Sequence, residues 1–269
     1  MPDQSPEERP YPAGIPAVFE IVRRLRAPDG CPWDREQTHQ SLRPYLLEET
    51  YEVLETLDRG DDDEHLREEL GDLLLQVAMH AAIAEEQGRF DAADVSEGEA
   101  AKMVSRHPHV FGDVQVSSAE EVLRNWEARK AADAAANGKA GELVLDRVPA
   151  TLPALAWTYN MQKRAARVGF EAPGPGAVEA VEERAQALRG SRPGGPEVEA
   201  AVGDLLLSVV TLARALKVNP EDALRTAGQR YRDRFARMDT ALKERGRGYR
   251  DLPAEDVEEA WEAAGSATR

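Results

Sequence analysis

The chain has 269 residues, of which 42% are hydrophobic and 31% charged, and this suits a globular protein of one large domain or two ordinary ones. Its formal net charge of -16 argues against general nucleic-acid binding, because an acidic surface repels phosphate backbones. No apolar run approaches the roughly 20 residues of a membrane helix, and the single Cys31 excludes an internal disulfide, so we expect a cytoplasmic protein that does not bind membranes.

The chain begins with a proline-rich segment, residues 1–16, which lacks the apolar region of a signal peptide and is expected to be a flexible tail. Apolar residues then recur at three- and four-residue intervals over 42–57, 66–87 and 119–136, which is the spacing of helices. Glycine and proline separate these segments, and no stretch alternates convincingly with the period of a strand. The sequence therefore predicts an all-α fold.

Three motifs occur twice in the same order, at a nearly constant spacing of 132 to 135 residues. They are LGDLLL at 70–75 and VGDLLL at 202–207, Glu48-Glu49 and Glu182-Glu183, and Trp126-Glu127 and Trp261-Glu262. Ordered repetition of this kind indicates a duplicated domain. We expect an N-terminal domain at 17–130, an alanine-rich linker at 131–150 and a C-terminal domain at 151–265.

Acidic residues are concentrated in the first of these domains, with twelve carboxylates and only two arginines between Glu48 and Asp72. On a helix, Glu48 and Glu52 lie about 40° apart and Glu49 lies about 60° from Glu52, so the three share one side. Leucines and a valine occupy the other side. This arrangement by itself is that of an ordinary amphipathic helix with a solvated acidic face.

A second acidic group stands at the start of a helix that continues into the apolar segment 73–79. Glu68, Glu69 and Asp72 are spaced three and four residues apart, so they cluster at the entrance of a helix that we expect to be largely buried. Carboxylates in such a place repel one another and lose solvation. A divalent cation relieves both costs, and Mg²⁺ prefers oxygen ligands of this type.

Five ordered motifs resemble those of the MazG family of all-α nucleoside triphosphate pyrophosphohydrolases. They are GCPWD at 30–34, QT at 37–38, YLLEE at 45–49, ELGDLL at 69–74 and RHPHVF at 106–111. The resemblance covers residues 17 to 262 and implies tandem four-helix-type MazG domains. It also implies Mg²⁺-dependent hydrolysis of a nucleoside triphosphate between the α- and β-phosphates, giving the monophosphate and pyrophosphate.

The resemblance implies a role for each candidate side chain. The metal ligands would be Glu49, Glu52, Glu69 and Asp72, binding Mg²⁺ or, as a substitute, Mn²⁺, and the metal would lower the pKa of an attacking water. Glu48 would either share the metal or orient that water, and Glu52 would also serve catalysis. The family builds its sites from paired subunits, so we expect a homodimer.

Positive and aromatic groups for the nucleotide are also indicated. Lys102 and Arg106 are four residues apart on an expected helix and share a face, as do Trp126 and Lys130. The resemblance implies that the basic groups bind phosphates and that the tryptophan contacts the base. Without the resemblance, the two cations are ordinary surface charges and the tryptophan an ordinary core residue.

The second repeat has lost part of the metal pattern. Gln186 replaces the third acid of the first helix, Ala201 stands at the position of Glu69, and only Asp204 is kept from the second pair. Arg230 and Arg234 match the first repeat's cations, but Gly265 stands opposite Lys130. We therefore predict a catalytic N-terminal repeat and a structural or regulatory C-terminal one.

Three alternatives stay open at the level of sequence. The substrate could be a deoxynucleotide, a nucleotide with a damaged base or a guanosine tetraphosphate alarmone. A di-iron carboxylate bundle requires two Glu-x-x-His pairs, and the chain offers only Glu36-x-x-His39. A non-enzymatic helical adaptor would also carry acidic faces.

Overall fold

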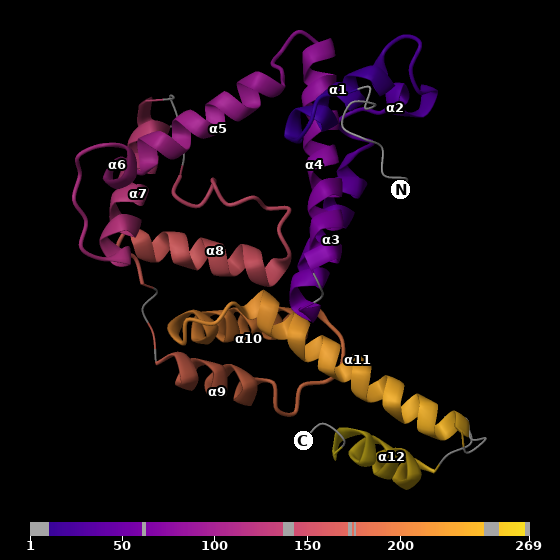
Figure 1. Cartoon of the computed structure of the whole chain (residues 1–269). Coiled ribbons are helices and arrows are strands. Elements are labelled where there is room, and N and C mark those ends of the chain that lie inside the picture. The colour runs from indigo at the N-terminus through magenta and orange to yellow at the C-terminus, as the bar shows by residue number, and fades with distance from the viewer. Residues whose placement is uncertain are drawn as a thin grey trace. The chain divides into compact units, whose positions relative to one another are not determined.

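The computed structural model describes residues 11–60, 63–136, 143–171, 174, 176–244 and 253–266. Every regular element within these ranges is a helix, which confirms the predicted all-α class (Figure 1). The chain divides into two compact units, Met1–Ala140 and Gly141–Arg269. None of the helices in the described part of the chain combines the length and the apolarity needed to cross a bilayer.

The first unit contains seven helices within the described ranges. They are α1 (Ile15–Arg26), α2 (Pro32–Glu36), α3 (Arg43–Arg59), α4 (Asp63–Glu86), α5 (Ala92–Arg106), α6 (Pro108–Phe111) and α7 (Ala119–Ala136). Helix α3 ends at Gly60, whose φ of 65° is the left-handed conformation that glycine adopts without strain. Helix α5 begins at a capping box in which Asp91 and Asp94 each accept a hydrogen bond from the other's backbone N–H.

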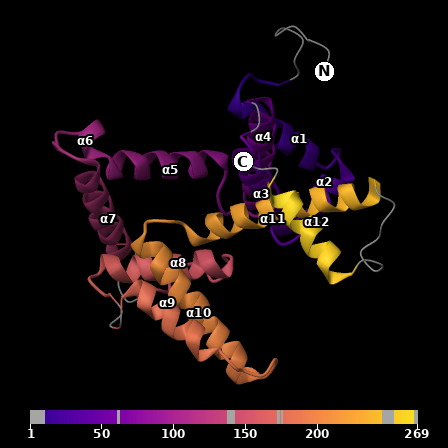
Figure 2. The ribbon, with the colours of Figure 1, turned by 90° about the horizontal axis from the view of Figure 1, so that it is seen from below.

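Helix α4 is the central element of this unit, and α1 and α3 pack along it (Figures 1 and 2). Val22 of α1 and Leu42, which precedes α3, are buried against Met79, Ala82 and Ile83 of α4. Burial of each such side chain stabilises the folded protein by roughly 1.5–3 kcal/mol relative to leaving it exposed. This small core holds α1 and the start of α3 against α4, and α3 and α4, the two helices that carry the acidic motifs, pack along each other.

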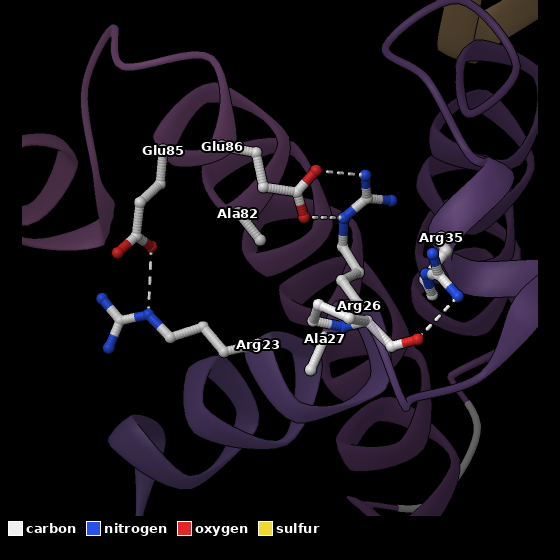
Figure 3. A pocket seen from close by; sticks show the side chains of 8 residues that line it. Arg23, Arg26, Ala27, Arg35, Ala82, Glu85 and Glu86 are labelled. Carbon is white, nitrogen blue, oxygen red and sulfur yellow. Dashed lines mark hydrogen bonds and ion pairs between the residues drawn. The ribbon is translucent and has the colours of Figure 1, made fainter.

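Two arginines attach α1 to the C-terminal end of α4 (Figure 3). Arg26, whose side chain is 4% exposed, donates from Nε and Nη2 to the two carboxylate oxygens of Glu86 at 2.7 and 2.8 Å. Its Nη1 also donates to the carbonyl oxygens of Asp34 and Gln37, which ties α2 to the same point. Arg23 donates to Glu85 at 3.0 Å. A buried arginine with two parallel hydrogen bonds to one carboxylate stabilises the fold and also fixes the orientation of α1 against α4.

Helix α4 is less buried than its apolar sequence predicts. Ala78, Met79 and Ile83 are buried, but Leu75 and Val77 remain 37% and 40% exposed. The reason is that α1 and α3 cover only part of its circumference. On α3, Leu47 and Leu57 are likewise more than half exposed. The expectation of a largely buried helix therefore holds for most of the segment 76–84 and not for the N-terminal part of α4.

The second unit contains five helices within the described ranges. They are α8 (Ala154–Arg167), α9 (Ala177–Ala187), α10 (Pro196–Ala215), α11 (Pro220–Glu244) and α12 (Ala254–Ser266). Helices α8 and α9 pack against α10, and α12 packs against α11. Met238 and Leu242 of α11 form a buried cluster with Ala264 of α12, flanked by Trp261.

The repeated motifs stand on corresponding helices of the two units. The Glu-Glu pairs lie on α3 and α9, the Gly-Asp motifs on α4 and α10, and the tryptophans on α7 and α12. In both units an arginine lies over the tryptophan ring, Arg106 over Trp126 and Arg234 over Trp261. The division between the units falls inside the predicted 131–150 linker, of which the first residues, to Ala136, belong to α7. The limits of the two domains stay a prediction.

Candidate metal centre and nucleotide-binding residues

Three carboxylates from α3 and α4 come together in the first unit. Glu49 of α3 and Glu69 and Asp72 of α4 each offer an oxygen, and these oxygens all lie within 4.8 Å of one another. The three-residue step from Glu69 to Asp72 places both on the side of α4 that faces α3. Two helices that pack along each other therefore bring residues 20 or more positions apart into one cluster.

The crowding of these carboxylates changes their acidity. Partial burial raises the pKa of Glu49 to about 7, helped by a hydrogen bond with Glu52 and by the negative charges of Asp72, Glu52 and Glu69. The pKa of Glu69 is also raised, by desolvation and then by the charges of Glu52, Asp72 and Glu68. The cluster therefore carries more negative charge than its surroundings stabilise, which is the condition under which a bound cation is favoured.

The donor set fits a hard divalent cation. All the convergent atoms are carboxylate oxygens, the ligand type that Mg²⁺ and Mn²⁺ prefer. Within the described ranges no histidine or cysteine joins this group of three, which disfavours zinc. A site with few protein ligands also leaves room for waters and for phosphate oxygens.

The other predicted acids lie around this cluster and not within it. Glu52 is one helical turn from Glu49 and hydrogen-bonds to it. Glu48 is exposed and is not one of the three convergent ligands. Glu68 is exposed, and its negative charge helps to raise the pKa of Glu69. The structure thus brings together three of the four predicted metal ligands and places the fourth, Glu52, beside them.

The predicted nucleotide-binding residues form a separate group on α5 and α7. The guanidinium carbon of Arg106 lies 5.4 Å from the centroid of the Trp126 ring, and its Nη2 lies 3.4 Å from a carboxylate oxygen of Asp133. Lys102, one turn earlier on α5, is exposed and paired with Glu99. Lys130 lies one turn after Trp126 on α7 and is half-buried.

This group does not lie against the carboxylates of the same chain. Figures 1 and 2 both show α5 leading away from α4, with α6 and α7 at its far end. The sequence predicted both groups but not this separation, because helical spacing reports which residues share a face and not where a helix leads. Sequence reasoning also missed Asp133, although its position seven residues after Trp126 places it on the same face of α7.

The second unit has a different arrangement at the corresponding place. Asp204 of α10 faces Arg184 of α9, with 3.7 Å between Oδ2 and Nη1. Among the described residues, no group of three potential metal ligands occurs in this unit. The loss of acids at Gln186 and Ala201 explains the difference from the first unit.

Known proteins share these features. The protein-family model of the MazG nucleotide pyrophosphohydrolase domain matches residues 37–111, the segment that contains α3, α4 and α5. The nucleoside triphosphate pyrophosphohydrolase/pyrophosphatase MazG of Thermotoga maritima is 42% identical over 248 residues, which span 92% of this chain and 94% of that protein. The chain belongs to the MazG family. A nucleoside triphosphate pyrophosphohydrolase of Escherichia coli K12 is 41% identical over 92% of this chain and 95% of its own length.

Another relative is a longer protein that is similar to both repeats. The uncharacterized protein YabN of Bacillus subtilis is 43% identical over 253 residues, which are 93% of this chain but 51% of YabN. In all three relatives the similarity extends over both repeats and not only the first.

Proposed function

We propose that this MazG-family protein hydrolyses nucleoside triphosphates to nucleoside monophosphates and pyrophosphate, and that the first repeat is the catalytic one. The observation that carries the proposal is the cluster of Glu49, Glu69 and Asp72, whose oxygens lie within 4.8 Å of one another. The names of the relatives from T. maritima and E. coli support the reaction. The same observations weigh against a non-enzymatic adaptor.

The acidic residues take two roles in this proposal. Glu49, Glu52, Glu69 and Asp72 would hold Mg²⁺, for which Mn²⁺ could substitute, and the bound ion would neutralise phosphate charge and lower the pKa of water. Glu48 and Glu52, on the same side of α3, orient the attacking water and accept its proton. The water oxygen bonds to the α-phosphorus as the bond to the bridging oxygen breaks, and pyrophosphate leaves with those electrons.

We also propose that the active form is a homodimer. Several apolar side chains on α3 and α4 stay exposed in the single chain, and a second copy would bury them. The side chains are Leu47, Leu54, Leu57, Leu70, Leu75 and Val77. Because Lys102, Arg106, Trp126 and Lys130 lie away from the carboxylates of their own chain, we assign them to the nucleotide bound at the site of the partner subunit.

Identification of the products tests the reaction. Each of a panel of ribo- and deoxynucleoside triphosphates, with Mg²⁺, is incubated with the full chain, and the products are separated by ion-exchange chromatography. We expect monophosphate and pyrophosphate in equal amounts from at least one nucleotide, and no product from the Glu69→Ala/Asp72→Ala double variant. Formation of a nucleoside diphosphate and orthophosphate would contradict the proposal. Unchanged turnover in the double variant would contradict it as well.

A further inference from the structure

In the second unit an ion pair joins α9 and α10, the helices that correspond to α3 and α4. Asp204 on α10 is the repeat equivalent of Asp72, and Arg184 on α9 lies two residues after the equivalent of Glu48. The Arg184 guanidinium approaches Asp204 across the α9–α10 pair, at 3.7 Å. In the first unit the carboxylate of Glu49 approaches Asp72 from the corresponding helix. A positive side chain therefore stands where the first repeat gathers negative ones.

The α9–α10 pair differs in charge from the α3–α4 pair of the first repeat in two ways. Gln186 and Ala201 remove two of the four predicted ligands, and Arg184 adds a positive charge at the position that Thr50 occupies in the first repeat. A hard divalent ion needs several oxygen ligands. It is also repelled by a guanidinium a few ångströms from the acid that it would bind. The residues present do not fit a divalent cation.

We propose that Arg184 is the resident cation of the second repeat, standing in for the metal ion of the first. The second repeat is then a metal-independent unit that supports the catalytic one. This inference rests on the proposed function of the first repeat. Since both side chains of the pair are more than half exposed, the pair adds little to folding stability. Its consequence is exclusion of a metal ion.

The second repeat also pairs the arginine that matches the first repeat's nucleotide-binding group. Arg234, the equivalent of Arg106, lies 4.0 Å from the centroid of the Trp261 ring. Its Nε and Nη2 both donate to the Trp261 carbonyl oxygen, at 2.9 and 2.7 Å. A Cβ at position 265 would displace the Arg234 guanidinium, because it would lie 2.7 Å from the guanidinium carbon.

The two units therefore use the matching arginine differently. Arg106 of the first unit pairs with the Asp133 side chain at 3.4 Å and lies farther from its tryptophan, at 5.4 Å. The replacement of Lys130 by Gly265 makes room for Arg234 against α12 and takes away one cation. In the second repeat Asp204 is thus paired with Arg184, and Arg234 is held by the backbone carbonyl and the ring of Trp261.

Reconstruction of the lost ligands tests the role of Arg184. The full chain with Glu69→Gln and Asp72→Asn removes the first site, and Gln186→Glu with Ala201→Glu restores acids to the second. Binding of Mn²⁺ alone is followed by electron paramagnetic resonance. We expect weak binding while Arg184 is present, and binding tighter by roughly tenfold or more after Arg184→Thr or Arg184→Gln, because a like charge has been removed.

Arg184→Lys is the matched control, because it keeps the positive charge and should bind Mn²⁺ as weakly as the parent. Arg184→Gln keeps most of the side-chain length and decides the outcome if Arg184→Thr does not fold, as judged by circular dichroism. Equal Mn²⁺ affinity with lysine and with glutamine would overturn the inference, as would no gain in either charge-removing variant. Failure of the proposed function has a separate sign. In that case the wild-type chain would show no Mn²⁺ binding that is lost on Glu69→Gln with Asp72→Asn.

Discussion

Glu49 links the geometry of the site to a measurable dependence on pH. Its pKa rises from an ordinary 4.5 to about 7 because it is partly buried and surrounded by Glu52, Asp72 and Glu69. Between these two values the folded protein holds a proton that the unfolded chain has released. The contribution of Glu49 to stability is therefore present at low pH and is lost as pH rises through 7. The shift at Glu69 has the same sign.

The corresponding prediction concerns Glu49→Gln in the absence of divalent cations. Because glutamine cannot ionise, we expect the variant to gain thermal stability relative to wild type as pH rises from 5.5 to 8. With Mg²⁺ added, the stabilisation of wild type by the ion should grow over the same range, since proton and metal compete for one carboxylate. Melting curves at several pH values, with EDTA or with Mg²⁺, provide the measurement. A difference between the two proteins that is independent of pH would contradict this account of Glu49.

Arg26 is the residue on which the position of α1 and α2 against α4 most directly depends. Arg26→Met removes two hydrogen bonds to Glu86 and two to backbone carbonyls. We expect a loss of about 3 kcal/mol in the free energy of unfolding, because the partners are left unpaired in a part-buried place. Urea denaturation measures this loss. The exposed Arg24, paired with Asp29 at the surface, is the control, and Arg24→Met should cost under about 1 kcal/mol.

At the scale of elements, the α3–α4 pair carries both the carboxylates and the exposed apolar side chains. A charge placed in a self-associating helical face opposes association, because it must lose its water there. We therefore expect Leu57→Lys to shift the protein from dimer to monomer in size-exclusion chromatography with light scattering. Leu143→Lys, at an exposed leucine outside the described helices, is the matched control and should leave the mass unchanged. A monomeric wild type, or a dimer that survives Leu57→Lys, would argue against this interface.

Much of this arrangement could be predicted from sequence, for a physical reason. The spacing of Glu69 and Asp72 places them on one face of a helix, and the apolar periodicity determines which face packs against a neighbour. The spacing cannot report long-range geometry. The course of α5 away from α4 and the exposure of Leu75 depend on which surfaces other helices cover. The pairing of Arg184 with Asp204 depends on contacts between helices and has no signature in local periodicity.

At the scale of the whole molecule, the proposed dimer predicts complementation between two inactive proteins. Asp72→Asn impairs the carboxylate cluster, and Arg106→Ala impairs the nucleotide-binding group. If each site combines the two groups from different subunits, equal mixing after dissociation and reassociation should restore about a quarter of wild-type activity, because half of the dimers then carry one intact site of two. No recovery in mixtures shown to contain mixed dimers would mean that both groups serve the same subunit's site.

The division of labour between the repeats is the central claim, and one comparison of three proteins tests it most directly. Pyrophosphate release from the best nucleoside triphosphate is measured with Mg²⁺ for wild type, Glu52→Gln and Asp204→Asn. We predict that Glu52→Gln lowers the rate by about 100-fold or more, whereas Asp204→Asn stays within about twofold of wild type, since Arg184 and not a metal ion faces Asp204. Loss of turnover in Asp204→Asn with full activity in Glu52→Gln would contradict the account and assign catalysis to the second repeat.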